Sequence, residues 1–497
     1  MRRTCFPVRK NLTRTSFLYR MIDNFRLRIF SAVAGLGSFT AAAKALGLSQ
    51  PAVSQNISEL ERFAGGRLLR RSRSGVELTE KGRRLLAQAE VVLRECSKLE
   101  NDFRAPQSIL LKAVLLGPKR CNILVRDGRF ADLDAPEETP ADKVIDAEGM
   151  AILPALYNTH NHAAMTLMRG YADDMPLEQW LQEYVWPFED KLTAADIRRG
   201  SDIAVREMAA SGSVFFSDMY FEIEETIKAV EESGMRAAIG ITVMENHSKS
   251  LEEQKMQFVH DWKDPTGGRI QLVMAPHSVY TVGPDKLKRS ATFARANGLR
   301  LHIHVAETRT EVENCIRDHG TTPVRYLDSL GFLGPDVIAA HCVHVDAEEW
   351  KILAARGVTV AHCPCSNMKL GSGRFPYELA IDSGCRITIG TDGVSSNNNL
   401  DMREEMKFAA LLAKVNGDPS LLPASEVFRW ATRNGAEAFG IDAGEVAAGK
   451  LADAILVDLG RSSMQPCHNL ISNYVYSADS SVVRCVLCDG QIIYSSL

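Results

Sequence analysis

The 497-residue chain contains 45% hydrophobic and 24% charged residues. That composition is typical of a globular protein, and the length is too great for one small core. No apolar stretch approaches the roughly 20 residues that span a bilayer, so we expect no membrane association. Eleven cysteines in a chain of this length do not indicate a disulfide framework. We therefore expect reduced thiols and a cytoplasmic location.

The net charge of −4 conceals a difference between the two parts of the chain. Residues 1–105 contain 20 basic and 9 acidic residues, whereas the remainder contains 38 basic and 53 acidic ones. We call residues 1–105 the head and the remainder the body. A basic head and an acidic body predict that only the head binds a polyanion. Residues 1–21 read as a basic leader, which is not native if translation starts at Met21.

Three short helices are predicted at the start of the head. Apolar residues recur at helical spacing over residues 24–34. Ser38 is a good N-cap for a second helix over residues 39–46, which Gly47 ends. Ser49 caps a third helix. Four polar residues of this third helix should point outward, as side chains that read base edges in a major groove do: Gln50, Ser54, Gln55 and Ser58.

A basic segment and a long helix follow. The segment carries arginines suited to phosphate contacts, namely Arg67, Arg70, Arg71 and Arg73. Thr79 then caps the helix, whose apolar residues predict a dimer seam: Leu86, Ala89, Leu93 and Cys96. The alternative is a small helical subdomain in which the arginines are simply solvated.

Three motifs of the head resemble the DNA-binding domain of LysR-type transcriptional regulators. They are Ser38-Phe-Thr-Ala-Ala-Ala-Lys-Ala-Leu, Leu48-Ser-Gln-Pro-Ala-Val-Ser and Gly75-Val-Glu-Leu-Thr-Glu-Lys-Gly. The resemblance implies an all-α winged helix-turn-helix and linker helix over residues 22–105, and double-stranded DNA as a partner. The effector domain usual in that family is absent from this chain.

The acidic body begins with short predicted strands over residues 106–150 and then changes its pattern. From residue 151 to 439, apolar strands alternate with amphipathic helices, which indicates an α/β fold of the (β/α)₈ barrel type. The eight predicted strands are 151–157, 213–218, 235–243, 270–276, 299–305, 337–341, 358–362 and 386–390.

Polar residues gather at the carboxyl ends of these strands, where barrel enzymes place their chemistry. His160 and His162 follow the first strand, and their i, i+2 spacing lets both imidazoles face one ion. A His-x-His pair alone could be two strand histidines with ordinary hydrogen bonds. The later partners favour a metal site: His304 and Glu307 after strand five, His341 after strand six, and Asp392 after strand eight.

The body resembles the amidohydrolase superfamily, and within it the deaminases of S-adenosylhomocysteine and 5′-methylthioadenosine. The motifs include Asn158-Thr-His-Asn-His, His304-Val-Ala-Glu307-Thr and Thr391-Asp-Gly-Val-Ser-Ser. The resemblance implies hydrolytic deamination of an adenosine-type nucleoside by a metal-bound hydroxide. It also implies a small β-sandwich built from residues 106–150 and 440–497.

The residue types allow roles to be assigned. His160, His162, His304 and Asp392 suit one divalent ion, Zn²⁺ or else Fe²⁺, with a position left for water. Glu307 is placed to shuttle a proton, while His341 and Asp392 orient and help deprotonate the water. Dinuclear relatives have a lysine after strand four, where this chain has Pro276-His277, so one metal is predicted.

Three further residues match substrate-binding positions of the resembling enzymes. Glu189 would bind ribose hydroxyls, and His277 and Ser396 would contact substrate, as would Glu307. Glu189 could instead be a solvated helix residue, and Ser396 a loop hydroxyl. Where relatives have arginines that read a carboxylate tail, this chain has Ile241 and Ser250. A substrate tail without a carboxylate is therefore favoured.

Three interpretations of the whole chain remain open. The first is an enzyme with a DNA-binding arm, assembled as a homo-oligomer. The second is a transcription regulator that uses the barrel as a ligand sensor. The third is an artificial fusion of two adjacent genes. The presence of Glu307, His341 and Asp392 favours catalysis, because a sensor has no need of a proton shuttle.

Overall fold

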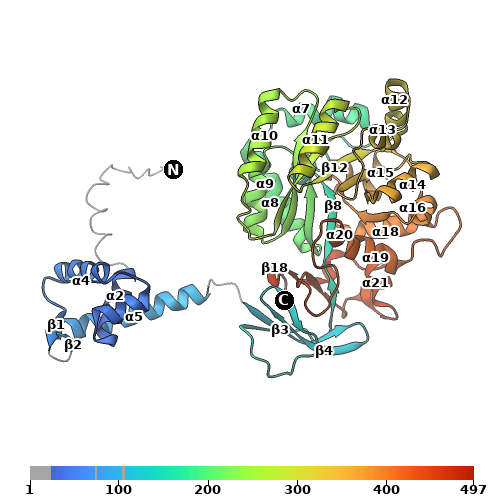
Figure 1. Ribbon diagram of the computed structural model, residues 1–497. Coiled ribbons are helices and arrows are strands. Elements are labelled where there is room, and N and C mark those ends of the chain that lie inside the picture. Colours follow the sequence, from blue (N-terminus) through green and yellow to red (C-terminus); the bar gives the residue numbers. More distant parts are fainter. Residues whose placement is uncertain (1–23, 73–74, 103–106) are drawn as a thin grey trace, which may run out of the picture. The chain divides into compact units, whose positions relative to one another are not determined.

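The computed structural model describes residues 24–72, 75–102 and 107–497 (Figure 1). It divides into two compact units, residues 1–105 and 106–497. The expected leader, residues 1–21, lies outside the described residues. None of the helices in the described ranges is both long and apolar enough to cross a membrane.

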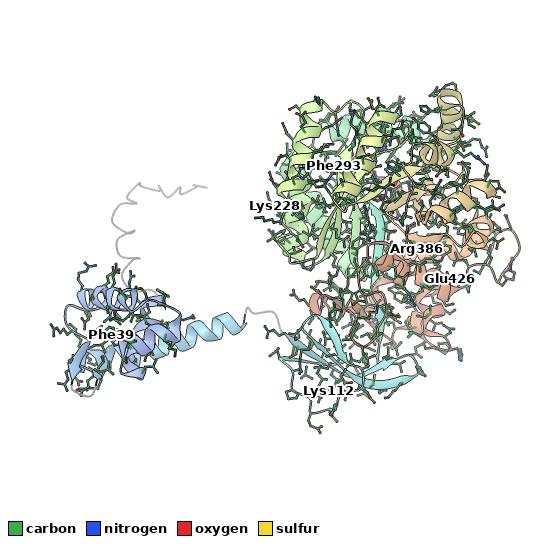
Figure 2. The ribbon with its side chains drawn as sticks, viewed as in Figure 1. Phe39, Lys112, Lys228, Phe293, Arg386 and Glu426 are labelled. Carbon is green, nitrogen blue, oxygen red and sulfur yellow. The ribbon has the colours of Figure 1, made fainter. Side chains whose placement is uncertain are left out.

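The first unit is a helical bundle with a two-stranded wing. Its elements are α2 (Asn24–Leu36), α3 (Phe39–Leu46), α4 (Gln50–Ala64), β1 (Leu69–Ser72), β2 (Gly75–Leu78) and α5 (Glu80–Asp102). Ile29, Phe30, Val53 and Leu60 lie in its buried core. Phe39, at the start of α3, packs against this core (Figure 2). The expected winged helix-turn-helix is confirmed.

Short side chains set the helix boundaries of this unit. Ser38 and Ser49 accept hydrogen bonds from the backbone N–H groups of Ala41 and Ala52, each at 3.3 Å. Thr79 accepts one from Gly82 at 3.0 Å. Each oxygen satisfies an N–H that has no partner within its own helix. The predicted caps are therefore confirmed.

The second unit contains a parallel eight-stranded barrel in the order β8 to β15. Its strands are β8 (Leu156–Asn161), β9 (Ser213–Asp218), β10 (Arg236–Val243), β11 (Ile270–Pro276), β12 (Arg300–Val305), β13 (Val337–His341), β14 (Thr359–His362) and β15 (Arg386–Ile389). Seven of the eight predicted strands match these within about one residue.

The prediction for the first strand was wrong in part. The expected strand over 151–157 is two strands: β7 (Met150–Pro154) pairs with β16 in a separate sheet, and β8 starts the barrel at Leu156. The residues on both sides of Ala155, from Ile152 to Leu156, form one largely buried run without polar side chains, so composition does not mark the boundary. As a consequence, His160 lies within the first barrel strand and does not follow it.

Helices alternate with the barrel strands and cover the barrel (Figure 1). The longer ones are α8 (Ala194–Ala210), α9 (Ile223–Ser233), α10 (Lys249–Asp261), α11 (Pro284–Ala296), α12 (Arg309–His319), α14 (Ala347–Arg356) and α18 (Met402–Ala413). The shorter ones are η1 (Ala163–Met168), α6 (Leu177–Gln179), η2 (Trp180–Val185), α7 (Trp186–Glu189), α13 (Pro323–Ser329), α15 (Pro364–Lys369), α16 (Tyr377–Asp382), α17 (Val394–Asn397), α19 (Ala424–Ala431) and α20 (Arg433–Ala438). Three further short helices lie beyond the barrel strands in the sequence: η3 (Ser462–Met464), α21 (Leu470–Tyr476) and η4 (Ser480–Val482).

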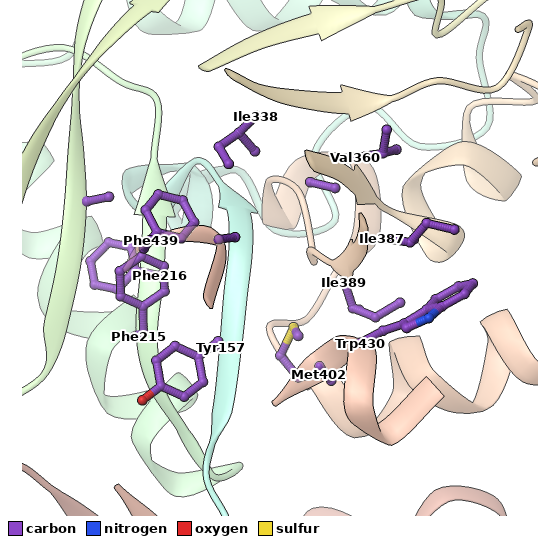
Figure 3. Close-up of a cluster of buried hydrophobic side chains, with 14 of the residues drawn as sticks. Tyr157, Phe215, Phe216, Ile338, Val360, Ile387, Ile389, Met402, Trp430 and Phe439 are labelled. Atoms are coloured by element: carbon purple, nitrogen blue, oxygen red, sulfur yellow. The ribbon is translucent and has the colours of Figure 1, made fainter. Parts of the chain in front are cut away.

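The last strand closes the barrel against the first. Thr159 Oγ1 donates to the Ile389 carbonyl at 2.9 Å, and the Asp392 N–H donates to the His160 carbonyl at 3.0 Å. A Cβ at Gly390 would come within 2.8 Å of the His160 Cβ, so only glycine permits this approach. Figure 3 shows part of the apolar core, where Phe215, Phe216 and Phe439 come together near Tyr157.

A second sheet flanks the barrel. Its order is β18-β17-β16-β7-β3-β4-β5, with β6 also paired to β3. The remaining strands are β3 (Ser108–Leu116), β4 (Lys119–Arg126), β5 (Arg129–Asp132), β6 (Lys143–Asp146), β16 (Ala454–Asp458), β17 (Val483–Cys488) and β18 (Gln491–Ser495). A bulge between Leu111 and Val114 interrupts β3, so its two halves pair with β6 and β7 in turn. The sheet thereby encloses its own apolar core.

A buried ionic cluster joins the second sheet to the barrel. Asp453 is fully buried and accepts hydrogen bonds from Tyr157 Oη at 2.6 Å and Arg236 Nε at 3.0 Å. The Asp489 N–H donates to its other oxygen at 2.6 Å. Burial lowers the pKa of Arg236, but Asp453, Asp489 and the other neighbouring groups together outweigh that effect, and the pKa is raised overall. The cluster keeps a charge buried only because all its partners are present.

Replacing Asp453 with alanine removes the partner of a buried guanidinium. We expect the Asp453→Ala variant to lose about 3–5 kcal/mol of unfolding free energy, measured by denaturant titration. The control is Asp134→Ala, which breaks the solvent-exposed pair with Lys119. That change should leave the unfolding midpoint where it is, and an equal loss in both variants would contradict the prediction.

Candidate active site and metal centre

Four imidazoles and one carboxylate converge at the carboxyl end of the barrel. His160 lies on β8, His304 on β12 and His341 at the end of β13, while His162 and Asp392 follow β8 and β15. All five side chains are buried. His160 Nε2 and His162 Nε2 lie 3.4 and 3.1 Å from Asp392 Oδ1. The structure thus brings together the residues that the sequence places far apart.

Each imidazole is oriented through its Nδ1 atom. His162 Nδ1 lies 2.6 Å from the Met219 carbonyl, His304 Nδ1 lies 2.7 Å from the His277 carbonyl, and His341 Nδ1 lies 2.9 Å from Asn367 Oδ1. Because an oxygen of this kind only accepts, Nδ1 carries the proton in these rings. In the neutral form of each ring, Nε2 then has a lone pair, the form in which histidine binds a metal.

His160 is oriented by a second histidine that the sequence did not reveal as part of the site. His160 Nδ1 lies 2.9 Å from His302 Nε2, and His302 Nδ1 lies 3.0 Å from Ser217 Oγ. His302 and His304 are two residues apart on β12 and therefore face the same side of the strand. This spacing was the signal in the sequence that could have placed His302 near the site. Burial lowers the pKa of His302 well below its usual value, which keeps this ring neutral.

The donor set fits a divalent ion. Two overlapping groups have their ligand atoms within 4.8 Å of one another: His160, His162 and Asp392, and His160, His304 and His341. His160 Nε2 is buried and has no hydrogen-bond partner, although an unsatisfied buried nitrogen is costly. Imidazole nitrogens with a single carboxylate are ligands that Zn²⁺ accepts.

Asp392 is fixed by groups on both of its oxygens. Ser366 Oγ and Ser396 Oγ donate to Oδ2 at 2.6 and 3.0 Å, and the Gly393 N–H donates to Oδ1 at 2.8 Å. The expected substrate contact by Ser396 finds no support in this geometry, because its hydroxyl faces Asp392 and Ser396 does not line the cavity. Sequence alone did not show that Ser396 and Ser366 share this carboxylate.

The electrostatics of the cluster follow from burial and from Asp392. Burial lowers the pKa of His160 to about 4 and that of His304 well below its usual value. Burial acts in the same direction on His162, but the Asp392 carboxylate outweighs it and raises that pKa to about 9. The centre therefore attracts one positive charge, which a proton or a metal cation can supply.

Glu307 lies beside this cluster and is itself buried. Its Oε2 is 3.8 Å from His341 Nε2, and Ser372 Oγ donates to its Oε1 at 3.4 Å. Burial and the nearby Asp392 raise the pKa of Glu307, although His341 opposes them. A carboxyl group with a raised pKa is better suited to accept a proton and return it.

A cavity of about 200 Å³ opens onto the cluster. Its polar lining includes the predicted residues Glu189, His277 and Glu307. Its apolar lining contains large side chains: Met165, Leu177, Trp180, Leu181, Trp186, Met219, Phe221, Met244, Tyr280 and Leu370. Apolar walls with a few converging polar groups are typical of a small-molecule site.

Two of the predicted substrate residues are held by neighbours. Tyr220 Oη donates to Glu189 Oε1 at 2.7 Å, and burial raises the pKa of Glu189 to about 6. Glu189 follows a π-helical turn, η2, a feature that recurs at functional sites. His277 Nδ1 lies 2.9 Å from Thr281 Oγ1, and burial lowers its pKa to about 3. Glu189 is therefore not a solvated helix residue.

The cavity wall opposite the histidine cluster contains a lysine, Lys255, that the sequence did not indicate as part of the site. Ile241 is buried in the barrel core and Ser250 is exposed, and neither lines the cavity. Lys255 on α10 does line it. Lys255 Nζ donates to the Thr242 carbonyl at 2.6 Å and lies 3.4 Å from His247 Nδ1. Burial lowers the pKa of Lys255 to about 8.

The predicted DNA-reading residues lie on α4. Gln50, Gln55 and Ser58 are exposed and Ser54 is half-buried. Gln50 Nε2 donates to Ser54 Oγ at 3.3 Å, so these two side chains lie next to each other. Arg73 and the side chain of Arg71 lie outside the described residues.

The comparisons with known proteins agree with this architecture. Residues 151–493 match the model of the amidohydrolase family, and residues 25–83 match that of the bacterial regulatory helix-turn-helix protein, lysR family. A 5′-deoxyadenosine deaminase from Methanosarcina mazei is 44% identical over 380 residues, 76% of this chain and 88% of that protein. A 5-methylthioadenosine/S-adenosylhomocysteine deaminase from Pelotomaculum thermopropionicum is 46% identical over 362 residues, 72% and 84% of the two chains.

A solved structure supports the same assignment. The adenosine deaminase from Xanthomonas campestris with bound zinc superimposes with a TM-score of 0.74 at 32% identity, over 78% of this chain and 92% of that one. The predicted family resemblances are thus confirmed for both units. The chain belongs to the amidohydrolase family, and its residues 25–83 form a LysR-type helix-turn-helix domain.

Proposed function

We propose that this protein is a metal-dependent hydrolase that deaminates an adenosine-type nucleoside, with a DNA-binding domain attached. The observation that carries the proposal is the placement of Glu307 at the wall of a small-molecule cavity, directly beside the imidazole and Asp392 cluster. The relatives named above, which act on 5′-deoxyadenosine, 5-methylthioadenosine or S-adenosylhomocysteine, support the same class of substrate.

One divalent ion would be held by His160, His162, His304 and Asp392, with Zn²⁺ favoured over Fe²⁺. The buried and unpartnered Nε2 of His160 supports this set, as does the zinc in the related adenosine deaminase. When bound, such an ion supplies Lewis acidity that makes water nucleophilic near neutral pH.

The protein's own residues would move the protons. Water replaces the exocyclic amine on the purine ring, so a C–O bond forms, a C–N bond breaks and ammonia leaves. Glu307 would take one proton from water and deliver it to the ring nitrogen, and would then pass the second proton of that water to the amine, which leaves as ammonia. His341, whose Nδ1 faces Asn367, would orient the reacting water through its Nε2, and Asp392 would accept a hydrogen bond from that water.

Two walls of the cavity would recognise the rest of the nucleoside. Glu189 would accept hydrogen bonds from the ribose hydroxyls, and His277 would contact the base. The far wall consists of apolar side chains and the single ammonium of Lys255, which lacks the paired donors of an arginine. We therefore favour a short tail without a carboxylate, as in 5′-deoxyadenosine or methylthioadenosine.

The first unit would bind double-stranded DNA. Exposed side chains of α4 would meet base edges. Of the residues expected in a dimer seam on α5, Leu93 is half-buried and could join one, whereas Ala89 is buried in its own unit and Leu86 packs against that unit's core. The side chain of Cys96, also predicted in this seam, lies outside the described residues. Regulation of transcription with the barrel as a sensor is the alternative, and it is compatible with catalysis.

Substitution of Glu307 by glutamine should abolish deamination because an amide cannot shuttle a proton. The measurement is ammonia release from methylthioadenosine, 5′-deoxyadenosine, adenosine and S-adenosylhomocysteine, together with metal content. We expect activity to fall by at least 10²-fold with metal content unchanged. Loss of metal would show that Glu307 is a ligand.

Much faster turnover of S-adenosylhomocysteine than of methylthioadenosine by the unmodified protein would contradict the assignment of a short tail.

Replacement of His302 by leucine should weaken metal binding about 10–100-fold, because His160 loses the group that orients it. Competition with a chelator measures this affinity. The matched control is His362→Leu, which removes an equally buried histidine on β14. The hydrogen-bond partner of the His362 side chain is the Tyr377 hydroxyl, and none of the proposed metal ligands contacts it. Equal weakening in both variants would assign the effect to general destabilisation.

Deletion of residues 1–105 should leave deamination intact and abolish salt-sensitive binding to duplex DNA. Both units have their own apolar cores, so each is expected to fold alone. Binding is measured by fluorescence anisotropy at several salt concentrations. If activity disappears with the deletion, the first unit is part of the enzyme's assembly.

A further inference from the structure

A second buried glutamate lies behind Glu307 and binds its backbone. Glu311 is only 4% exposed and lies in the first turn of α12. Its Oε1 accepts the N–H of Ala306 at 2.8 Å, and its Oε2 accepts the N–H of Glu307, also at 2.8 Å. One carboxylate therefore holds two successive amides of the turn that carries the proposed proton shuttle.

This arrangement differs from an ordinary helix cap. In α8 and α14 the third residue, Asp196 or Glu349, turns back to the N–H of its own N-cap residue. In α12 the cap is Thr308, whose Oγ1 already accepts the Glu311 N–H at 3.1 Å. Glu311 instead reaches past the cap to the preceding turn. The start of the helix does not require these two hydrogen bonds, so the Glu311 carboxylate stabilises the turn that contains Ala306 and Glu307.

The turn between His304 and Glu307 has little else to fix it. Ala306 adopts a left-handed conformation, with φ of 49°, which is unfavourable for a residue with a Cβ. The Ala306 carbonyl accepts the N–H of His344 at 2.9 Å. The Glu307 side chain receives one long hydrogen bond, from Ser372 at 3.4 Å. Its position is therefore set mainly by its backbone.

The energetic cost of Glu311 supports a specific role. Burial raises its pKa to about 7, although the two N–H groups oppose the rise, and the neighbouring Glu307 adds to it. Keeping a second carboxylate beside the first is unfavourable for stability alone. Such an arrangement is understandable where the gain is in placing a reacting group.

We propose that Glu311 is a positioning residue that fixes Glu307 in the orientation needed for proton transfer. It acts through the backbone amides of Ala306 and Glu307 and does not touch substrate or metal. This inference rests on the proposed function, because it assigns Glu311 a part in the same reaction.

The test compares Glu311→Gln with a matched control. Glutamine preserves the volume but turns an amide N–H₂ toward a backbone N–H, so one of the two bonds is lost. We expect kcat to fall about 10–100-fold, with KM changed less than threefold and metal content unchanged. The control is Glu349→Gln, which alters an equally buried glutamate at the same position of α14. Its kcat should equal that of the wild type.

A second measurement does not depend on turnover. Amide hydrogen exchange over residues 303–312 should accelerate at least tenfold in Glu311→Gln and stay unchanged in Glu349→Gln. Glu311→Asp, whose shorter side chain cannot reach both amides, should give the same acceleration and serves if the glutamine variant does not fold. Equal kcat in Glu311→Gln and Glu349→Gln, or unchanged exchange, would overturn the proposal. A wild-type protein without deaminase activity would overturn the proposed function. The amide hydrogen exchange would still show whether Glu311 holds the backbone amides of Ala306 and Glu307.

Discussion

A buried carboxylate, Asp392, governs the centre of this protein. The charge of Asp392 is unfavourable in the barrel interior unless every lone pair is engaged. Two hydroxyls and one backbone N–H supply part of that, and the Nε2 atoms of His160 and His162 lie close to its Oδ1, where a bound cation would be shared with it. These groups meet only when β15 lies directly against β8, which Gly390 permits. Closing the barrel and assembling the centre are therefore one event.

The barrel divides its rim between two tasks. The imidazoles and Asp392 come from β8, β12, β13 and β15, whereas the rest of the cavity wall comes mostly from residues 165–189, which follow β8, and from the ends of β9, β10 and β11. The first set consists of groups oriented through backbone carbonyls, an amide or a second imidazole. The second set is mostly apolar and holds few charges. This separation lets the recognition wall vary while the reacting set stays unchanged.

The sequence was sufficient for features that depend on local pattern. Apolar runs located seven barrel strands, and Ser38, Ser49 and Gly47 located the helix ends, because capping depends on neighbouring residues alone. It failed where the partner is distant in the chain. The division at Ala155 depends on pairing with β16, the role of His302 depends on His160, and Ser396 faces Asp392 in a way that only the folded loop defines. Lys255 was missed because α10 brings it to the cavity from beyond the strand end.

The pairing of β7 with β16 has a consequence for biosynthesis. The two strands lie on either side of the whole barrel sequence, so the ribosome releases β16 only after the barrel has been made. The helical unit, in contrast, is built entirely from neighbouring segments near the start of the chain. Local contacts form quickly and distant ones late. The nascent chain would therefore carry a folded helix-turn-helix well before its flanking sheet can close.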